Sequence, residues 1–241
     1  MGKMAKELVT AFFGKKKDIN IEAENINVRS LREMVKALLM LNENDWALYA
    51  FSREPLERKF SLEDKLQLAY LARVCGINEA NYVIGSDFTK CAEDMGFKVS
   101  TPDMPNGGAN VTFAQYEESG EITVFMDTVK KAEPILCEIR DLIGDVNIYN
   151  VLLLHELFHG IEQKKADTIY TQTKKVELWR KPFSNLSRIG CLSEIAAMSF
   201  AKSVLNLNYS PYIFDVILMY LYNKEAATML FDEIMEIKEA A

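Results

Sequence analysis

The sequence is poor in histidine, in paired cysteines and in positive charge, and each scarcity narrows the choice of function. Only two of its 241 residues are histidines. A net charge of −7 argues against a nucleic-acid-binding protein, whose binding surface is basic. The chain also lacks an apolar run of the roughly 18 residues that a membrane span requires. We therefore expect neither nucleic acid nor a membrane among its partners.

The cysteines indicate a reducing environment. Cys75, Cys91, Cys137 and Cys191 are scattered and form no C-x-x-C motif. The apolar piece near the start, Leu8–Phe13, is shorter than the core of a secretory signal, and no small-residue cleavage motif follows it. Scattered cysteines in a chain without an export signal are typically reduced, which predicts a cytoplasmic protein.

The first third of the chain carries the signals of helices. We expect a short helix and a lysine run within residues 1–27. Capping boxes at residues 30–33 (S-x-x-E) and 61–64 (S-x-x-D) then each precede apolar residues with helical spacing. The second of these helices is predicted to stop at Gly76, and a third to lie near residues 86–95.

The hydrophobic period changes after residue 96. Alternating apolar residues predict short strands at 97–100, 110–115 and 121–126, the last two joined by a hairpin loop. A helix near residues 134–143 and another over residues 151–163 follow. The prediction is an α+β fold, mainly helical, with a small sheet beside the helix at 151–163.

That helix holds the feature that points most directly to function, His155-Glu156-Leu157-Phe158-His159, an H-E-x-x-H pattern in an apolar run. Residues four apart lie on one face of a helix, so both imidazoles can point at the same spot. Imidazole nitrogens bind zinc at about 2.0–2.1 Å and would supply half of a tetrahedral site. Glu156 can then act as general base on the water that such a metal activates.

The alternative is a buried helix with two core histidines and a stray glutamate. Burying three such polar groups among Val, Leu, Ile and Phe without partners would cost several kcal/mol. A bound metal removes that cost, so the pattern favours zinc, or a zinc site that has since been lost.

A catalytic zinc site needs a third protein ligand, and no third histidine is available. Glu194 is the best candidate because it lies among small and apolar residues that predict a helix able to approach His155 and His159 closely. Glu194 could instead face solvent or cap its helix. The other candidates from the sequence are Asp167, Glu177 and Asp215, with Cys191 more typical of a small core residue.

These residues carry a family resemblance. His155-Glu156-x-x-His159 followed by Glu194-x-x-Ala197-x-x-Phe200 resembles the ImmA/IrrE-type zinc metallopeptidases, of the gluzincin branch of zincin-like proteases. The likeness covers roughly residues 85–205. It implies a zincin-like fold in which His155, His159 and Glu194 bind zinc and Glu156 is the catalytic base.

The chain departs from that pattern in three ways. Met198 stands where such families often have Asn or Asp, so a hydrogen bond to a zinc ligand is missing or comes from elsewhere. The connection from His159 to Glu194 carries a sizeable insertion. Residues 1–84 have no counterpart in the resemblance, which suggests an N-terminal helical extension (1–84) and a zincin-like metallopeptidase domain (85–241).

The insertion, residues 163–190, is basic within an acidic protein. It holds seven Lys or Arg residues against Asp167 and Glu177. A basic lip beside the active site would favour acidic substrates or an acidic partner, whereas a solvated connector would have no such role. Peptide hydrolysis also needs a group that stabilises the oxyanion, for which location alone suggests Tyr170, Tyr209 or Tyr212.

The sequence thus predicts a zinc-dependent peptidase whose partner is a peptide or protein substrate. The competing interpretation is a non-catalytic zincin-like regulatory or binding protein whose metal is structural or lost. An open coordination position on the metal distinguishes the two.

Overall fold

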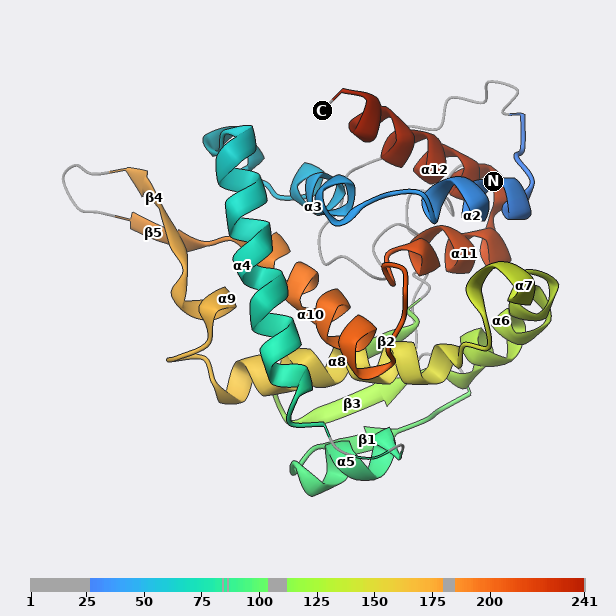
Figure 1. The fold of residues 1–241 in the computed structure, drawn as a ribbon. Coiled ribbons are helices and arrows are strands. Elements are labelled where there is room, and N and C mark those ends of the chain that lie inside the picture. Colours follow the sequence, from blue (N-terminus) through green and yellow to red (C-terminus); the bar gives the residue numbers. More distant parts are fainter. Residues whose placement is uncertain (1–26, 84, 86, 104–111, 180–184, 241) are drawn as a thin grey trace.

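The computed structural model describes residues 27–83, 85, 87–103, 112–179 and 185–240. This part of the chain is mainly helical with two small sheets, so the prediction of a mixed α+β fold is confirmed (Figure 1). The short helix and lysine run predicted near the N-terminus, and the first residues of the strand predicted at 110–115, lie outside the described residues.

The larger sheet has three strands in the order β1-β3-β2. β1 (Lys98–Ser100) pairs in parallel with β3 (Glu121–Val124), and β2 (Ala114–Tyr116) pairs antiparallel with β3. Gly120, at φ 90°, makes the turn between β2 and β3, a conformation that favours glycine. The strand predicted at 97–100 and the hairpin are confirmed. β2 begins later than the strand predicted at 110–115, and Met126, predicted as the end of the last strand, begins the next helix.

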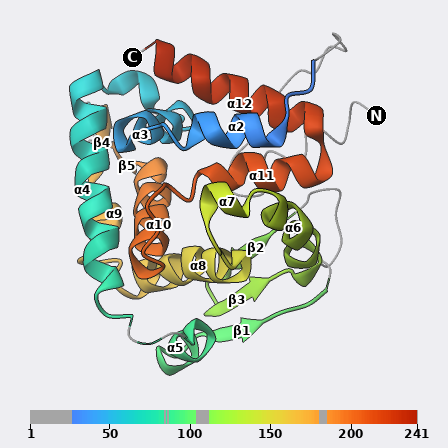
Figure 2. The same cartoon turned by 45° about the vertical axis from the view of Figure 1, so that its right-hand side comes forward.

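The central helix is α8 (Ile148–Lys164), which carries the H-E-x-x-H motif. It contacts β2 and β3 on one side and α10 (Gly190–Val204) on the other, and Figure 2 shows it between the sheet and α10. Because it is covered on both sides, α8 is apolar nearly all round and shows no single apolar stripe.

The described part of the N-terminal region contributes α2 (Leu31–Leu38), α3 (Glu43–Ser52) and α4 (Leu62–Ala80). The capping box at 61–64 forms as predicted. The box at 30–33 is wrong, since the Ser30 side chain makes no capping hydrogen bond, although the helix behind it is present. α3 is not among the predicted helices, yet Asn42 and Asp45 form a capping box at its start.

α4 continues past Gly76, where the sequence predicts its end. A Cβ atom on Gly76 would lie 2.1 Å from the carbonyl oxygen of Ala196 on α10. Gly76 therefore allows two helices to cross closely, and burial at that crossing outweighs the tendency of glycine to end a helix.

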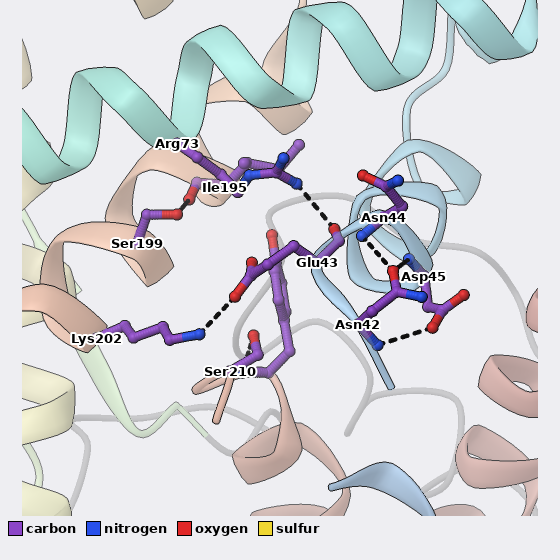
Figure 3. A network of polar contacts seen from close by, with 10 residues as sticks. Asn42, Glu43, Asn44, Asp45, Arg73, Ile195, Ser199, Lys202 and Ser210 are labelled. Atoms are coloured by element: carbon purple, nitrogen blue, oxygen red, sulfur yellow. Dashed lines mark hydrogen bonds and ion pairs between the residues drawn. The ribbon is translucent and has the colours of Figure 1, made fainter. Parts of the chain in front are cut away.

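Polar contacts tie α3 and α4 to α10 next to this crossing (Figure 3). Lys202 forms an ion pair with the Glu43 carboxylate at 2.5 Å, and Arg73 donates to the Glu43 backbone oxygen at 3.0 Å. α2 and α3 also contact α11 (Ile213–Tyr222) and α12 (Lys224–Glu239), respectively. The helices before residue 84 thus pack on those after residue 190, and the division of the chain at residue 84 stays a prediction.

The basic connection contains secondary structure of its own. A short helix, α9 (Tyr170–Thr173), is followed by a hairpin of β4 (Lys175–Trp179) and β5 (Asn185–Arg188), which projects from the body in Figure 1. β5 leads directly into α10.

The remaining elements complete the core. Two helices, α6 (Met126–Glu138) and α7 (Arg140–Ile143), cover the stretch for which the sequence predicts one helix at 134–143. The first begins earlier than predicted because Val129, Ala132 and Leu136 form a buried face that keeps Pro134 inside a helix. No described helix combines the length and the apolar character needed to cross a membrane. The other elements are η1 (Glu57–Lys59) and α5 (Phe88–Asp94).

Candidate metal centre

Three side chains converge where α8 and α10 meet. His155 Nε2 and His159 Nε2 lie 3.1 Å apart. The Glu194 carboxylate lies 3.3 Å from His155 Nε2 through Oε2 and 3.7 Å from His159 Nε2 through Oε1. The sequence-predicted ligand set therefore forms one group, in which one donor atom from each residue lies within 4.8 Å of the others.

These separations fit a tetrahedral zinc ion. Bonds of about 2.0–2.1 Å at tetrahedral angles place neighbouring donor atoms about 3.3–3.4 Å apart. The donors are also of the right kind, two imidazole nitrogens and a carboxylate oxygen. Glu194 Oε2 is buried and faces His155 Nε2 at 3.3 Å, so a cation bound between the two atoms would have both as ligands.

Two different elements place Glu194. Gly76 of α4 packs on the Ala196 carbonyl of α10, whereas the contact of α10 with α8 includes the Phe158 and Phe200 rings, 5.7 Å apart. The small residues around Glu194 thus permit the close approach of α4, and aromatic packing joins α10 to the histidine helix. Glu54, which is distant in sequence, caps the start of α10, because its Oε2 accepts a hydrogen bond from the Cys191 backbone N–H at 3.1 Å.

A second layer of polar groups orients His159. The Ser193 hydroxyl lies 3.1 Å from His159 Nδ1 and donates to Glu162 Oε2 at 2.7 Å. Met198, at the position where the resembled families often have Asn or Asp, is a buried core residue. The supporting hydrogen bond therefore comes from elsewhere, and the sequence analysis missed Ser193 and Glu162. Their only sequence signal is position, since Glu162 lies three residues after His159 and Ser193 directly precedes Glu194.

Charges at the site shift the pKa values of its groups. Burial disfavours the imidazolium form of His159, but the carboxylates of Glu194 and Glu162 outweigh it and raise the pKa to about 9. Burial opposes ionisation of Glu194 as well, yet the adjacent His159 and His155 lower the pKa of that carboxyl. Both shifts have the same cause, the Glu194 carboxylate lying against the two imidazoles.

Glu156 has the opposite shift. Burial raises its pKa, and this effect exceeds the opposing attraction to His155 and His159. A carboxylate with a raised pKa is a stronger base, which suits it to take a proton from water.

The alternative ligands lie outside this group. Asp215 is buried and accepts a hydrogen bond from Tyr49 Oη at 3.0 Å. Asp167, Glu177 and Cys191 are likewise not members of the described cluster that could hold a metal ion.

The three candidate oxyanion stabilisers have separate surroundings. Tyr209 Oη donates to the backbone oxygen of Ile143 at 3.0 Å and is therefore engaged elsewhere. Tyr170 lies on α9 and has its pKa raised by burial. Tyr212 is buried against Trp46, with ring centroids 5.6 Å apart, and burial followed by the charge of Glu194 raises its pKa. Of the three tyrosines, Tyr212 is the one whose pKa the Glu194 carboxylate raises.

Comparison with protein-family profiles, with curated proteins and with solved structures found no match for the chain. The resemblance to ImmA/IrrE-type peptidases therefore rests on the motif residues alone, and the function must be argued from the site.

Proposed function

We propose that the protein is a zinc-dependent peptidase of the zincin-like, gluzincin type, similar to the ImmA/IrrE-type enzymes. The observation that carries the proposal is the convergence of His155 Nε2, His159 Nε2 and the Glu194 carboxylate at 3.1–3.7 Å. The three groups match the donor set of a catalytic zinc site that keeps one position open. The α+β arrangement, with a small sheet on one side of α8 and α10 on the other, is consistent with that fold.

A zinc ion held by these residues supplies positive charge that polarises a peptide carbonyl and acidifies a water molecule. Glu156 provides the base, since it follows the first histidine and burial raises its pKa. It takes the proton of the attacking water and returns it to the leaving amine nitrogen. Ser193 and Glu162 keep the His159 ring in the orientation that directs Nε2 toward the group.

An edge strand beside α8 offers a place for the substrate backbone. Among the described strands β2 pairs only with β3, so its other edge forms no described strand pairing, and β2 contacts α8. The backbone N–H of Tyr116 on β2 is close enough to Glu156 to lower the pKa of that carboxyl in part. An extended peptide that adds to this edge would present its scissile bond next to Glu156.

The four cysteines are all free, which supports the expectation of a reducing, cytoplasmic setting.

Glu156→Gln tests the proposal because it removes the base and keeps the shape of the side chain. Purified, zinc-loaded protein should cleave a mixture of unfolded peptides, and the variant should lose at least about a hundred-fold in rate. Its circular dichroism spectrum and zinc content should equal those of the parent. Retention of most of the activity would refute the role of Glu156, and a zinc-loaded parent without any cleavage would favour the non-catalytic scaffold.

A further inference from the structure

A cleft of about 460 Å³ borders Glu194, one of the three residues of the candidate metal centre. Its walls come from the end of α3, from β5 and from the first turn of α10, and Glu194 is one of the lining residues. The volume falls within the roughly 300–1,000 Å³ typical of ligand sites. The cleft therefore joins the proposed zinc ligand to the basic hairpin. The wall residues that matter here are Arg53, Glu54, Ser187, Arg188, Cys191 and Glu194.

The acidic groups on these walls already have partners. Glu54 is 6% exposed, and its two oxygens accept the backbone N–H groups of Cys191 at 3.1 Å and Leu56 at 3.2 Å. Glu194 faces the two histidines. Neither carboxylate is thus available to neutralise a cation on the opposite wall.

The two arginines on the walls differ in whether their charge already has a partner within the protein. The Arg53 guanidinium lies 4.6 Å from the Tyr49 ring centroid. Burial opposes the charge of Arg53, but Tyr49, Glu233 and Asp215 outweigh it and raise the pKa. Arg188 is exposed and forms no ion pair with any side chain that the structure describes. Arg188 is therefore the cation of this cleft that a ligand can engage.

The structure also divides the basic connection into residues that border the cleft and residues that do not. Lys164 donates to the Met95 backbone oxygen, and Lys165 pairs with Glu79 of α4 at 2.6 Å. The two lysines thus contact the end of α5 and α4, respectively, and neither lines the cleft. The sequence predicted a basic lip formed by this connection. Among the described residues of the connection that line the cleft, Arg188 is the one that is basic.

We infer that Arg188 binds a carboxylate of the substrate, so that the cleft selects peptides with an acidic side chain or a free carboxyl terminus close to the scissile bond. The inference rests on the proposed peptidase function. A guanidinium matches a carboxylate through two parallel hydrogen bonds, and a partly enclosed cleft screens that pair less than open solvent does.

Binding to the zinc-loaded Glu156→Gln protein tests this inference without hydrolysis. The probes are end-blocked fluorescent peptides that carry one glutamate in a neutral background, at each position in turn, and the matching glutamine peptides. We expect the best glutamate peptide to bind at least about ten-fold more tightly than its glutamine counterpart. Arg188→Gln in the same background should abolish that difference. The matched control is Lys175→Gln. Lys175 lies opposite Arg188 in the β4–β5 register, its substitution removes the same charge, and it does not line the cleft.

Two further arms identify the carboxylate and guard against a disturbed variant. A neutral peptide with a free carboxyl terminus, compared with its amide, shows whether the terminus or a side chain is recognised. Arg188→Glu should reverse the preference in favour of a lysine peptide, a gain that a misfolded protein could not show. Equal binding of all peptides to the Glu156→Gln protein would overturn the inference. So would an equal loss of affinity for the glutamate peptide when Arg188→Gln or Lys175→Gln is added to it.

The result is separable from the proposed function. Cleavage by the parent without any preference for acidic peptides would refute the role of Arg188 and leave the peptidase intact. Binding of acidic peptides through Arg188 without cleavage would retain the recognition site and refute the peptidase.

Discussion

The Ser193 hydroxyl on α10 lies 3.1 Å from Nδ1 of His159 on α8. The same hydroxyl gives its one proton to the Glu162 carboxylate at 2.7 Å. Burial opposes ionisation of Glu162, but its contacts with His159, Thr171 and Ser193 lower its pKa, so it is an acceptor. His159 must lose one proton to bind a metal ion, and in that neutral form Nδ1 is the donor to Ser193, which leaves the lone pair of Nε2 for the metal.

Ser193→Ala should therefore weaken zinc binding, because the ring of His159 loses the group that sets its tautomer. We expect a loss of about 10–100-fold in affinity, measured by competition with a fluorescent chelator. Ser199→Ala is the matched control, since Ser199 lies on the same helix and donates only to the Ile195 backbone oxygen of its own turn. Equal affinities of the two variants would show that Ser193 has no positioning role.

The histidine pair should determine the metal content. Protein purified without chelator is expected to contain about one zinc ion per chain by elemental analysis. The double variant His155→Ala, His159→Ala removes two of the three donors and should contain almost none. Zinc at the parent level in that variant would place the metal at another site.

Substitution of the acidic residues separates Glu194 from the other candidates in the sequence. Glu194→Ala should lower zinc affinity by at least about a hundred-fold, as expected for loss of a direct ligand. Asp167→Asn and Glu177→Gln remove the same charge outside the metal group and should leave affinity within about two-fold. A loss in either control as large as that in Glu194→Ala would contradict the assignment of the third ligand.

Zinc removal should lower the melting temperature, since a ligand that binds only the folded state stabilises it by mass action. Free zinc at about a hundred times its dissociation constant contributes about 2.7 kcal/mol. For a domain of this size that corresponds to a shift of about 5–11 °C in a thermal scan with and without chelator. The His155→Ala, His159→Ala variant should show no shift, and a parent that loses zinc without a change in melting temperature would contradict the linkage.

Gly76→Ala should destabilise the protein although alanine is the better helix former. The new Cβ atom would approach the Ala196 carbonyl oxygen to 2.1 Å, so α4 and α10 must separate. We expect the free energy of unfolding to fall by at least about 2 kcal/mol in a denaturant titration. Helix propensity alone predicts a gain of about 1 kcal/mol, and a gain would mean that the helices do not cross closely at this point.

Several features of the chain could be predicted because they depend on residues close in sequence. The spacing of His155 and His159 places both on one face of a helix, whatever packs around it. The S-x-x-D box at 61–64 satisfies backbone groups within its own turn. Helical and alternating periods also indicated a mostly helical α+β fold, with β2 and β3 near their observed positions.

Errors arose where packing between distant segments outweighs local preference. Glycine and proline are typical of helix boundaries, yet Gly76 and Pro134 both lie inside helices. Gly76 does so because α4 packs closely on α10 there, and Pro134 because its helix buries an apolar face. No secondary structure was predicted for the basic connection, and it forms the β4–β5 hairpin.

The sequence by itself determined the chemistry available at the centre, since two histidines four residues apart and an adjacent glutamate are a local property of one helix. Only the tertiary structure decided which carboxylate completes the group, which hydroxyl orients His159 and which basic residue reaches the cleft. Glu194, Ser193 and Arg188 lie 29–39 residues from the histidines along the chain. Their distances to the site depend on how α10 and the hairpin pack against α8, and no periodicity along the chain encodes that geometry.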